Sequence, residues 1–486
     1  MNRKMVFYML GHIIMLEGVI LILPALCSLI YGEKSFFAFL VAIAVALAVG
    51  GLLHFLNRKH DKTIFAKEGF VIVSLAWISL SLIGAIPYVV SGEIPSVADA
   101  VFESVSGITT TGASILENVE LCSKGINFWR CFSNWIGGMG VLVLFMAIFP
   151  TESGRTMHIM RAEMPGPIVG KLVPKIKSTA KILYFIYIAL TGLETVLLLT
   201  SGLSFYESLV LSFSTAGTGG FSVYADGLGS ATAFQQWIVA IFMMIFGVNF
   251  NIYYLILIKK IRTAVKSEEI WTYFGIVLTA TLLIAVNIYK TVGNFSDAIR
   301  HSFFQVSSIV TTTGFSTVDF NLWPSFSKAI LFVLLFMGAC AGSTAGGFKI
   351  SRVVILFKSI KANLKKLIHT RSITSVTFEG KTLESGMMVN VLSYLAIYCL
   401  CFLAIFLIIG FEPFELETNL SAVATCFNNV GPGVNAVGPA GNFSAYTDFS
   451  KYVLSFAMLL GRLEIYPLLL LFAPSAWKKA RTVKRS

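Results

Sequence analysis

Long apolar segments alternate with short polar loops along most of this chain. A segment of about 20 mainly apolar residues is long enough to cross a bilayer as a helix. The pattern predicts about ten such spans, at Met5–Tyr31, Ser35–Leu56, Gly69–Val90, Phe128–Phe149, Ile182–Ser201, Trp237–Ile258, Ile270–Tyr289, Ala329–Phe357, Met388–Gly410 and Tyr452–Ala473. Because 56% of the residues are hydrophobic and only 13% are charged, an ordinary soluble globular protein is excluded. We therefore expect an all-α polytopic membrane protein.

The first apolar segment follows Arg3 and Lys4, as the core of a secretory signal does. It is much longer than such a core, and it contains His12 and Glu17. We interpret it as a helix that the protein retains.

Four further segments are amphipathic and too short to span a bilayer: Val97–Thr109, Phe205–Thr215, Ser296–Val310 and Leu416–Phe427. Each is followed by a glycine-centred string, and the four strings align on their central glycines: Thr110-Thr111-Gly112, Thr218-Gly219-Gly220, Thr312-Thr313-Gly314 and Asn429-Val430-Gly431. The central glycines are 108, 94 and 117 residues apart, which leaves room for one helix, one re-entrant hairpin and a second helix. The sequence thus predicts a fourfold internal repeat.

The strings have the composition of an ion-selectivity filter. Non-helical backbone at membrane depth is tolerated only inside protein or against water, so four such strings should gather round one wet axis. Carbonyls that replace a cation's water shell must all face inward, which requires backbone angles that glycine adopts readily. The hydroxyls of Thr110, Thr218 and Thr312 would add oxygens, with Asn429 as an amide substitute. A single Thr-Thr-Gly is more often a turn or a helix contact, but four in the same place favour a pore.

Charge follows the predicted topology. Alternate loops hold 29 of the 37 lysines and arginines, which places both termini in the cytoplasm. The opposite loops hold seven basic and fourteen acidic residues, a net charge of −7 that would either attract cations to a pore mouth or form an ordinary solvated surface. The overall +12 therefore reflects topology and does not indicate nucleic-acid binding.

Cys122 and Cys131 share an outer loop, and both a disulfide and a reduced pair remain open; no cysteine spacing is typical of a metal site.

Two features lie inside the predicted spans without fitting a continuous apolar helix. The small-residue run Gly338–Gly347 interrupts the eighth span and predicts either a broken helix or a close helix crossing. Arg462 is the basic residue deep in the last span, and a charge at such a place normally faces water or a partner. Its alternatives are a pore-lining position, a pair with Glu464, or extension to the cytoplasmic surface.

At these residues the chain resembles the Trk/Ktr/HKT superfamily of potassium transporters, and most closely its TrkH branch. The resemblance covers nearly the whole chain. Beyond the four strings it rests on Arg161–Pro167, Gly138–Gly140, Gly338–Gly347, Gly461–Glu464 and the extra helix pair before Gly69.

The resemblance implies four helix, pore-helix, helix units around one pore. The corresponding division is 1–68 for an N-terminal helix pair, 69–175, 176–268 and 269–385 for the first three pore repeats, and 386–486 for the fourth repeat with a basic tail. The filter would consist of Thr110, Thr111, Gly112, Thr218, Gly219, Gly220, Thr312, Thr313, Gly314, Asn429, Val430 and Gly431, with potassium as the bound ion. The gate would consist of Gly338, Gly342, Ser343, Thr344, Gly346 and Gly347, with Arg462 as an electrostatic barrier. Glycine at 112, where some family members have serine, favours potassium over sodium, whereas Gly219 and Pro432 depart from the usual pattern.

The resemblance also implies partners. The expected assembly is a homodimer in the bacterial inner membrane, bound to a cytosolic TrkA-type ring of nucleotide-binding subunits that adenine nucleotides control. The basic loops Thr151–Lys181 and Lys358–Lys381 would either dock that ring or contact anionic lipid headgroups. No organic cofactor is expected in this chain itself.

Two transport hypotheses follow. The first is gated potassium uptake through a channel-like filter, driven by the membrane potential. The alternative is symport of potassium with protons or sodium, which usually needs titratable groups at mid-membrane; the strings contain none. The chain is not expected to be an enzyme, because the spans contain no paired Asp, Ser-Lys or His-Glu groups.

Overall fold

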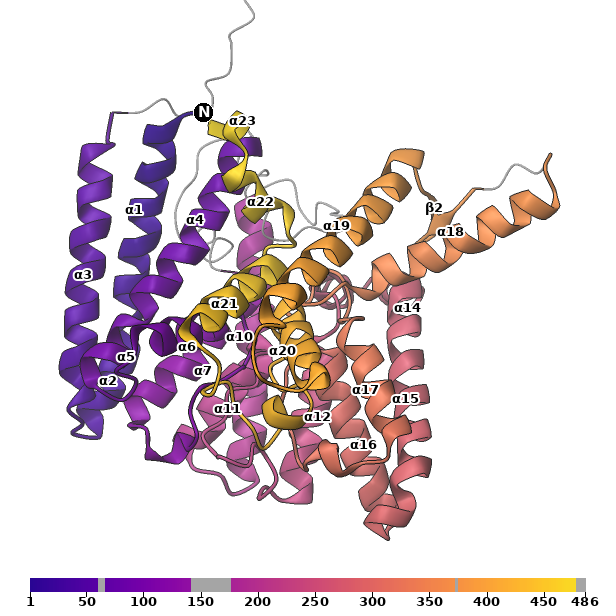
Figure 1. Cartoon of the computed structure of the whole chain (residues 1–486), viewed down its shortest axis with the longest axis horizontal. Helices are drawn as coiled ribbons and strands as arrows, with labels where there is room; N and C mark the ends of the chain where they lie inside the picture. Colours follow the sequence, from indigo (N-terminus) through magenta and orange to yellow (C-terminus); the bar gives the residue numbers. More distant parts are fainter. Residues whose placement is uncertain (60–65, 141–175, 372–374, 478–486) are drawn as a thin grey trace, which may run out of the picture.

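The computed structural model describes residues 1–59, 66–140, 176–371 and 375–477. The N-terminal helices form one flank of the molecule, and helices from the later parts of the chain stand beside them (Figure 1). An N-terminal layer comes first. After it, a long helix, a short inward helix and a second helix follow one another, and this series of three occurs four times. The expected all-α membrane architecture is confirmed.

The N-terminal layer consists of α1 (Arg3–Ile20), α2 (Ile22–Ile30) and α3 (Ser35–Leu56). Helices α1 and α3 cross closely at two glycines, since a Cβ at Gly11 would lie 2.7 Å from the Gly50 carbonyl oxygen. Small residues let helix backbones approach in this way inside a membrane.

The first helix of each repeat is long and apolar. These helices are α4 (Ala66–Gly84) with its continuation α5 (Ile86–Ser91), α10 (Ile176–Thr200), α15 (Glu268–Val292) and α19 (Ser385–Ile409).

The short inward helices are α6 (Val97–Ile108), α11 (Phe205–Gly217), α16 (Phe295–Val310) and α20 (Leu416–Asn428). Their bounds agree with the predicted half-helices to within two residues. Ser96, Ser204 and Asn294 cap the first three with side-chain oxygens, which satisfies backbone N–H groups left over at a helix start.

The second helices are less regular than predicted. They are α7 (Lys124–Met139), α12 (Ala233–Phe246) with α13 (Phe250–Leu257), α17 (Ser325–Leu335) with α18 (Ile350–Ile368), and α21 (Asp448–Arg462) with α22 (Tyr466–Phe472). The prediction of unbroken spans at Trp237–Ile258 and Tyr452–Ala473 was wrong. An 88° bend separates α12 from α13, and a break at Leu463–Ile465 separates α21 from α22. Within the described ranges six helices are long and apolar enough to cross a membrane, or seven if the bent pair counts as one span.

The remaining elements are short connections. They are η1 (Val119–Leu121), α14 (Ile261–Val265), η3 (Phe320–Leu322), the antiparallel strands β1 (Thr377–Phe378) and β2 (Lys381–Thr382), η4 (Asn435–Val437) and α23 (Pro474–Trp477).

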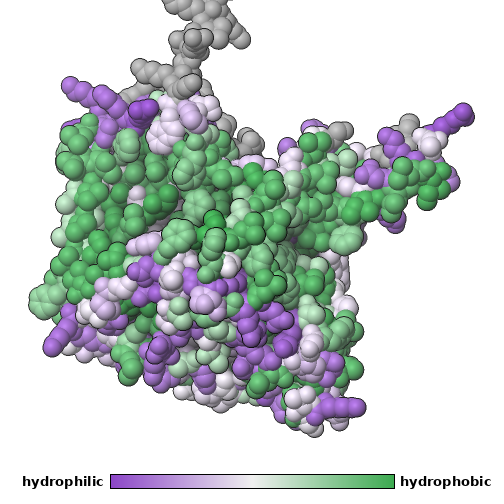
Figure 2. Space-filling model, viewed as in Figure 1, coloured by the Kyte–Doolittle hydropathy of each residue, from purple (hydrophilic) through white to green (hydrophobic). Residues whose placement is uncertain are grey.

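Hydrophobic side chains cover the flank formed by α1 and α3, and hydrophilic ones gather at the lower end of the molecule (Figure 2). The two ends of the described chain lie together at the upper side, where the Arg3 guanidinium stands 5.9 Å from the Trp477 ring (Figure 1). Helix α18 projects from the body on that side.

Candidate ion pathway

Each inward helix ends in the same way. The residues two places before the central glycines, Thr110, Thr218, Thr312 and Asn429, all have φ between 53° and 56°. The next N–H in each string donates back to the inward helix five residues earlier: Thr111 to Ser106, Gly219 to Ser214, Thr313 to Ser308 and Val430 to Thr425, at 2.8–3.0 Å. This closure satisfies helix-end carbonyls and redirects the chain. A left-handed backbone conformation costs free energy for residues other than glycine. Because all four strings adopt it at the same position, the same backbone geometry is required in each of them.

The four strings lie against one another in a closed ring. A Cβ on Gly112 would lie 2.0 Å from the Gly219 oxygen. The same contact runs from Gly220 to Thr313 O at 2.0 Å, from Gly314 to Val430 O at 2.1 Å, and from Gly431 to Thr111 O at 2.8 Å. Each central glycine also has a positive φ. Glycine is therefore required at each position for two reasons: the positive φ angle and the lack of space for a side chain.

The side-chain oxygens of the strings are not equivalent. Thr110 Oγ1 and Asn429 Oδ1 are buried without a hydrogen-bond partner in the structure. Thr312 Oγ1 instead accepts from the Gly346 N–H at 2.7 Å, and Thr218 Oγ1 donates to the Gly217 carbonyl at 2.7 Å. Two of these four side-chain oxygens thus make a hydrogen bond and two make none, and Asn429 Oδ1 lies against α21, where a Cβ on Gly461 would be 2.7 Å from it.

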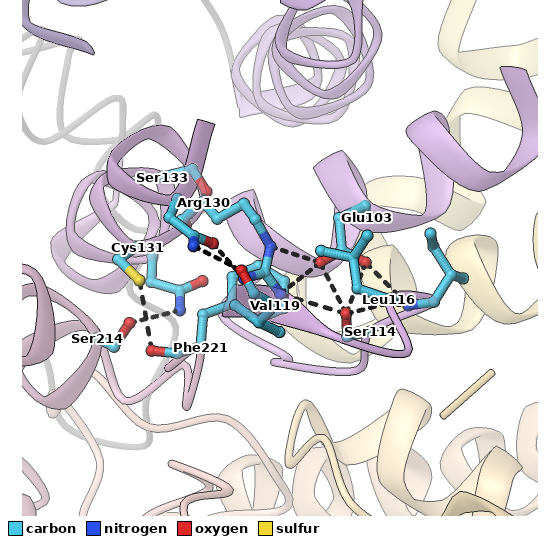
Figure 3. A network of polar contacts seen from close by, with 12 residues as sticks. Glu103, Ser114, Leu116, Val119, Arg130, Cys131, Ser133, Ser214 and Phe221 are labelled. Carbon is cyan, nitrogen blue, oxygen red and sulfur yellow. Dashed lines mark hydrogen bonds and ion pairs between the residues drawn. The ribbon is translucent and has the colours of Figure 1, made fainter. Parts of the chain in front are cut away.

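A buried polar network supports the residues that follow the first string (Figure 3). Arg130 Nε donates to Glu103 Oε1 at 2.8 Å, and the Ser114 hydroxyl donates to the same oxygen at 3.0 Å. Arg130 also lies over the Phe221 ring at 4.2 Å. Arg130 and Glu103 are 1% and 0% exposed, so the pair fixes the first string against the second. Arg130 also lines a cavity together with the four central glycines.

Arg130→Gln should strongly destabilise the fold, because it leaves the Glu103 charge buried without its partner. Breaking a buried pair costs about 3–5 kcal/mol. The matched control is Arg300→Gln, which removes a partly exposed pair with Asp297 and should cost about 0–1 kcal/mol. Thermal unfolding in detergent measures both, and an equal shift for the two variants would contradict the structural role of the Arg130 pair.

A second cavity lies on the opposite side of the strings. The segment Gly338–Gly347 separates α17 from α18 as a loop, so the predicted helix break is observed. The loop reaches the third string through the Gly346 N–H, and a Cβ on Gly346 would lie 2.7 Å from the Asn428 oxygen. Gly342, Ser343, Gly346 and Gly347 line this cavity, whereas Gly338 and Thr344 do not.

Arg462 crosses the same cavity. Its guanidinium donates to Thr344 O at 2.7 Å and to Gly137 O and Gly138 O at 2.5 and 2.7 Å. It thereby links α21, the loop and α7. The predicted alternative of an Arg462–Glu464 pair does not form, because Glu464 pairs with Arg352 instead. Lys349, bonded to Ala345 O, adds a second cation to the cavity lining.

The connection between α19 and α20 contains a carboxylate that stays ionised, Glu412. Burial disfavours the charged form of Glu412, but hydrogen bonds from Ser450 and Thr447 outweigh it and hold the pKa of this carboxyl below its usual range. The Thr447 N–H donates to Glu412 Oε1 at 3.1 Å. This carboxylate remains negative at neutral pH on the predicted extracellular face.

The structure brings together all twelve residues of the four strings, and it brings the 338–347 loop and Arg462 to one side of them. Cys122 and Cys131 are free thiols. Most of Thr151–Lys181 and the motif 161–167 lie outside the described residues. Sequence reasoning missed the Arg130–Glu103 pair and Asn249, whose side chain lies against the loop: a Cβ on Gly342 would be 3.0 Å from Asn249 Oδ1. The triplet Gly247-Val248-Asn249, at the bend of an otherwise apolar span, was the available signal for Asn249.

Similar proteins define the class to which this architecture belongs. The family described as "TrkH: Cation transport protein" matches residues 35–479. The Trk system potassium uptake protein TrkH of Salmonella typhimurium is 35% identical, and the match covers 99% of this chain and 100% of that protein. The TrkG protein of Escherichia coli is 31% identical over 98% of the chain and 99% of its own length. The crystal structure of the potassium transporter TrkH from Vibrio parahaemolyticus superposes with a TM-score of 0.89 at 32% identity, covering 98% of this chain and 100% of that one.

The fold and the ring of re-entrant strings are those of a membrane transport protein. The chain belongs to the TrkH family of cation transport proteins. It is accordingly a transporter and not an enzyme.

Proposed function

We propose that this protein takes up potassium across the bacterial inner membrane through a channel-like filter formed by the four strings, with both termini in the cytoplasm. The observation that carries the proposal is the closed ring of strings, in which each central glycine contacts the carbonyl of the next string. Inward carbonyls replace the hydration shell of a cation. The curated relatives are named potassium uptake proteins, which supports potassium as the substrate.

The loop 338–347 and Arg462 together form the gate in this proposal. The loop lies directly under the third string through the contact of Gly346 with Thr312. Arg462 places a positive charge beside the path and holds the loop at Thr344 O. Movement of the loop would therefore break the Arg462 contact and displace the charge in one step.

The proposal also includes a homodimer and a cytosolic TrkA-type regulator that adenine nucleotides control. The proposed domain division is an N-terminal helix pair followed by four pore repeats. Helix α18 supports the homodimer, because it exposes an apolar stripe at helical spacing, formed by Phe357, Ile360, Leu364 and Leu367. The basic residues of the same arm, Lys358, Lys361, Lys365 and Lys366, suit contact with the regulator.

The direct test is uptake of rubidium or potassium into liposomes that contain the purified protein, driven by an inside-negative voltage. We expect sodium to compete weakly, because Gly112 preserves the full carbonyl ring. Equal uptake of sodium and potassium would contradict the proposed filter.

Symport is tested through Glu17 and Glu194, two of the carboxylates that are buried within candidate spans. Neither lines the cavity on either side of the strings. Glu17→Gln and Glu194→Gln should therefore leave voltage-driven uptake within about twofold of wild type. Loss of proton-driven uptake in either variant would instead support a coupled carrier; Ser91→Ala, at the end of α5, is the control substitution.

A further inference from the structure

A large apolar groove lies outside the ion pathway, where α12 and α13 bend. It has a volume of about 800 Å³, within the range of about 300–1,000 Å³ typical of ligand pockets. Its lining includes Met244, Val248, Ile252, Trp271, Phe274 and Leu278. Trp271 and Leu278 are 63% and 62% exposed, so the groove opens on an exposed apolar flank of α15.

Basic side chains stand at one end of this groove. The connection between α13 and α15 contains four exposed cations, Lys259, Lys260, Arg262 and Lys266. Within the described ranges none of them forms an ion pair with a carboxylate. The nearby acids are engaged elsewhere, since Glu268 pairs with Lys358 and the buried Glu269 accepts the Ala341 N–H.

Trp271 marks the boundary between the apolar and the charged part. Its indole N–H donates to the Val265 carbonyl at 2.7 Å, while the ring lines the groove. Tryptophan is enriched at this depth, where the hydrocarbon of a bilayer meets its headgroups.

We propose that this groove is a binding site for an anionic phospholipid, with an acyl chain against α12, α13 and α15 and the phosphate at Lys259, Lys260, Arg262 and Lys266. Charge complementarity selects this occupant. An apolar helix of a second protein would leave four cations unmatched, and a zwitterionic lipid would bring no net charge to them.

The opposite face of the same bend holds the 338–347 loop. The Cys340 N–H donates to Gly247 O at 3.1 Å, and the Phe250 N–H donates to Gly342 O at 3.1 Å. The Ala341 N–H donates to Glu269 Oε1 at 2.7 Å, one residue before the groove-lining Ile270. A lipid in the groove would fix the angle of the bend and therefore the position of the loop. This coupling rests on the proposed gate, whereas lipid binding does not.

Binding is tested on the purified full-length protein by native mass spectrometry after exchange into phosphatidylglycerol or phosphatidylcholine. Replacing all four cations by glutamine (K259Q, K260Q, R262Q and K266Q) should lower retained phosphatidylglycerol at least fivefold. The charge-matched control, K361Q, K365Q, K366Q and R371Q, should remain within twofold of wild type. An equal loss in both quadruple variants would mean non-specific attraction and would overturn the site.

The groove itself is tested by Leu278→Trp, which fills it without changing charge. The matched control is Leu282→Trp, one turn further along α15 and outside the groove lining. Retention should fall for the first variant and stay unchanged for the second, with equal thermal stability. Unchanged retention for Leu278→Trp would overturn the acyl-chain position, and preference for phosphatidylcholine would overturn the anionic headgroup.

Coupling is tested by potassium flux in liposomes with and without phosphatidylglycerol. The potassium flux of wild type should differ at least threefold between liposomes with and without phosphatidylglycerol. Both the K259Q/K260Q/R262Q/K266Q variant and Leu278→Trp should lose this dependence. Lost binding with an unchanged lipid dependence of flux would contradict the coupling. Lipid binding by a wild type that passes no potassium would contradict the proposed function while leaving the site intact.

Discussion

Gly112→Ser should lower the preference for potassium over sodium about tenfold, which corresponds to about 1.4 kcal/mol. A Cβ at this position would lie 2.0 Å from the Gly219 oxygen, so the neighbouring carbonyl must move away from its place in the ring. Rubidium uptake with sodium competition measures the change. Because the corresponding space at Gly431 is wider, 2.8 Å to Thr111 O, Gly431→Ser should have the smaller effect of the two.

Gly51→Ser is the matched control for the filter variants. Gly51 lies on α3, and a Cβ there would meet nothing within 4 Å. Its selectivity should equal that of wild type. If Gly112→Ser also kept wild-type selectivity, the ring of strings could not be the selective element.

Arg462→Gln should raise potassium flux in the absence of a regulator about tenfold. The guanidinium lies in the cavity on the loop side of the strings, and unit charges a few ångströms apart in partly wet protein repel by more than about 1.4 kcal/mol, which corresponds to tenfold in rate. Glutamine removes the charge but is too short to keep all three guanidinium hydrogen bonds, so it is compared with Arg462→Lys.

Arg462→Lys and Lys361→Gln show whether a higher flux in Arg462→Gln comes from the lost charge or from the lost hydrogen bonds. The first keeps the charge and should keep flux low, whereas the second removes an exposed charge from α18 and should change nothing. A flux increase in Arg462→Lys equal to that in Arg462→Gln would show that the hydrogen bonds of the guanidinium, not its charge, restrict passage.

Much of the fold could be predicted because hydropathy and length decide which segments span a membrane. The bounds of α3 and of the four inward helices follow from the apolar pattern and from the glycines after them. The breaks in the second helices could not be found in the same way. Only the third repeat has enough glycine to show a break, whereas the 88° bend depends on contacts of Gly247 and Phe250 with a loop almost 100 residues away.

The candidate site was predictable in its backbone and less so in its side chains. Spacing identified the four strings because glycine is needed wherever backbone passes against backbone. It could not show that Thr312 contacts the loop while Thr110 stays without a partner, since both are threonines in the same context. Arg130 and Glu103 were visible only as outer-loop charges, because their pairing depends on how α6 meets α7.

The reversal potential of currents through the purified protein in a planar bilayer tests the central claim most directly. With a tenfold potassium gradient, sodium as the balancing cation and equal pH on both sides, we predict a reversal potential close to 59 mV, the value for one charge moving alone. An added pH gradient should not shift it. A reversal potential near zero, or one that follows the proton or sodium gradient, would contradict a potassium-selective channel-like filter and would favour a coupled carrier.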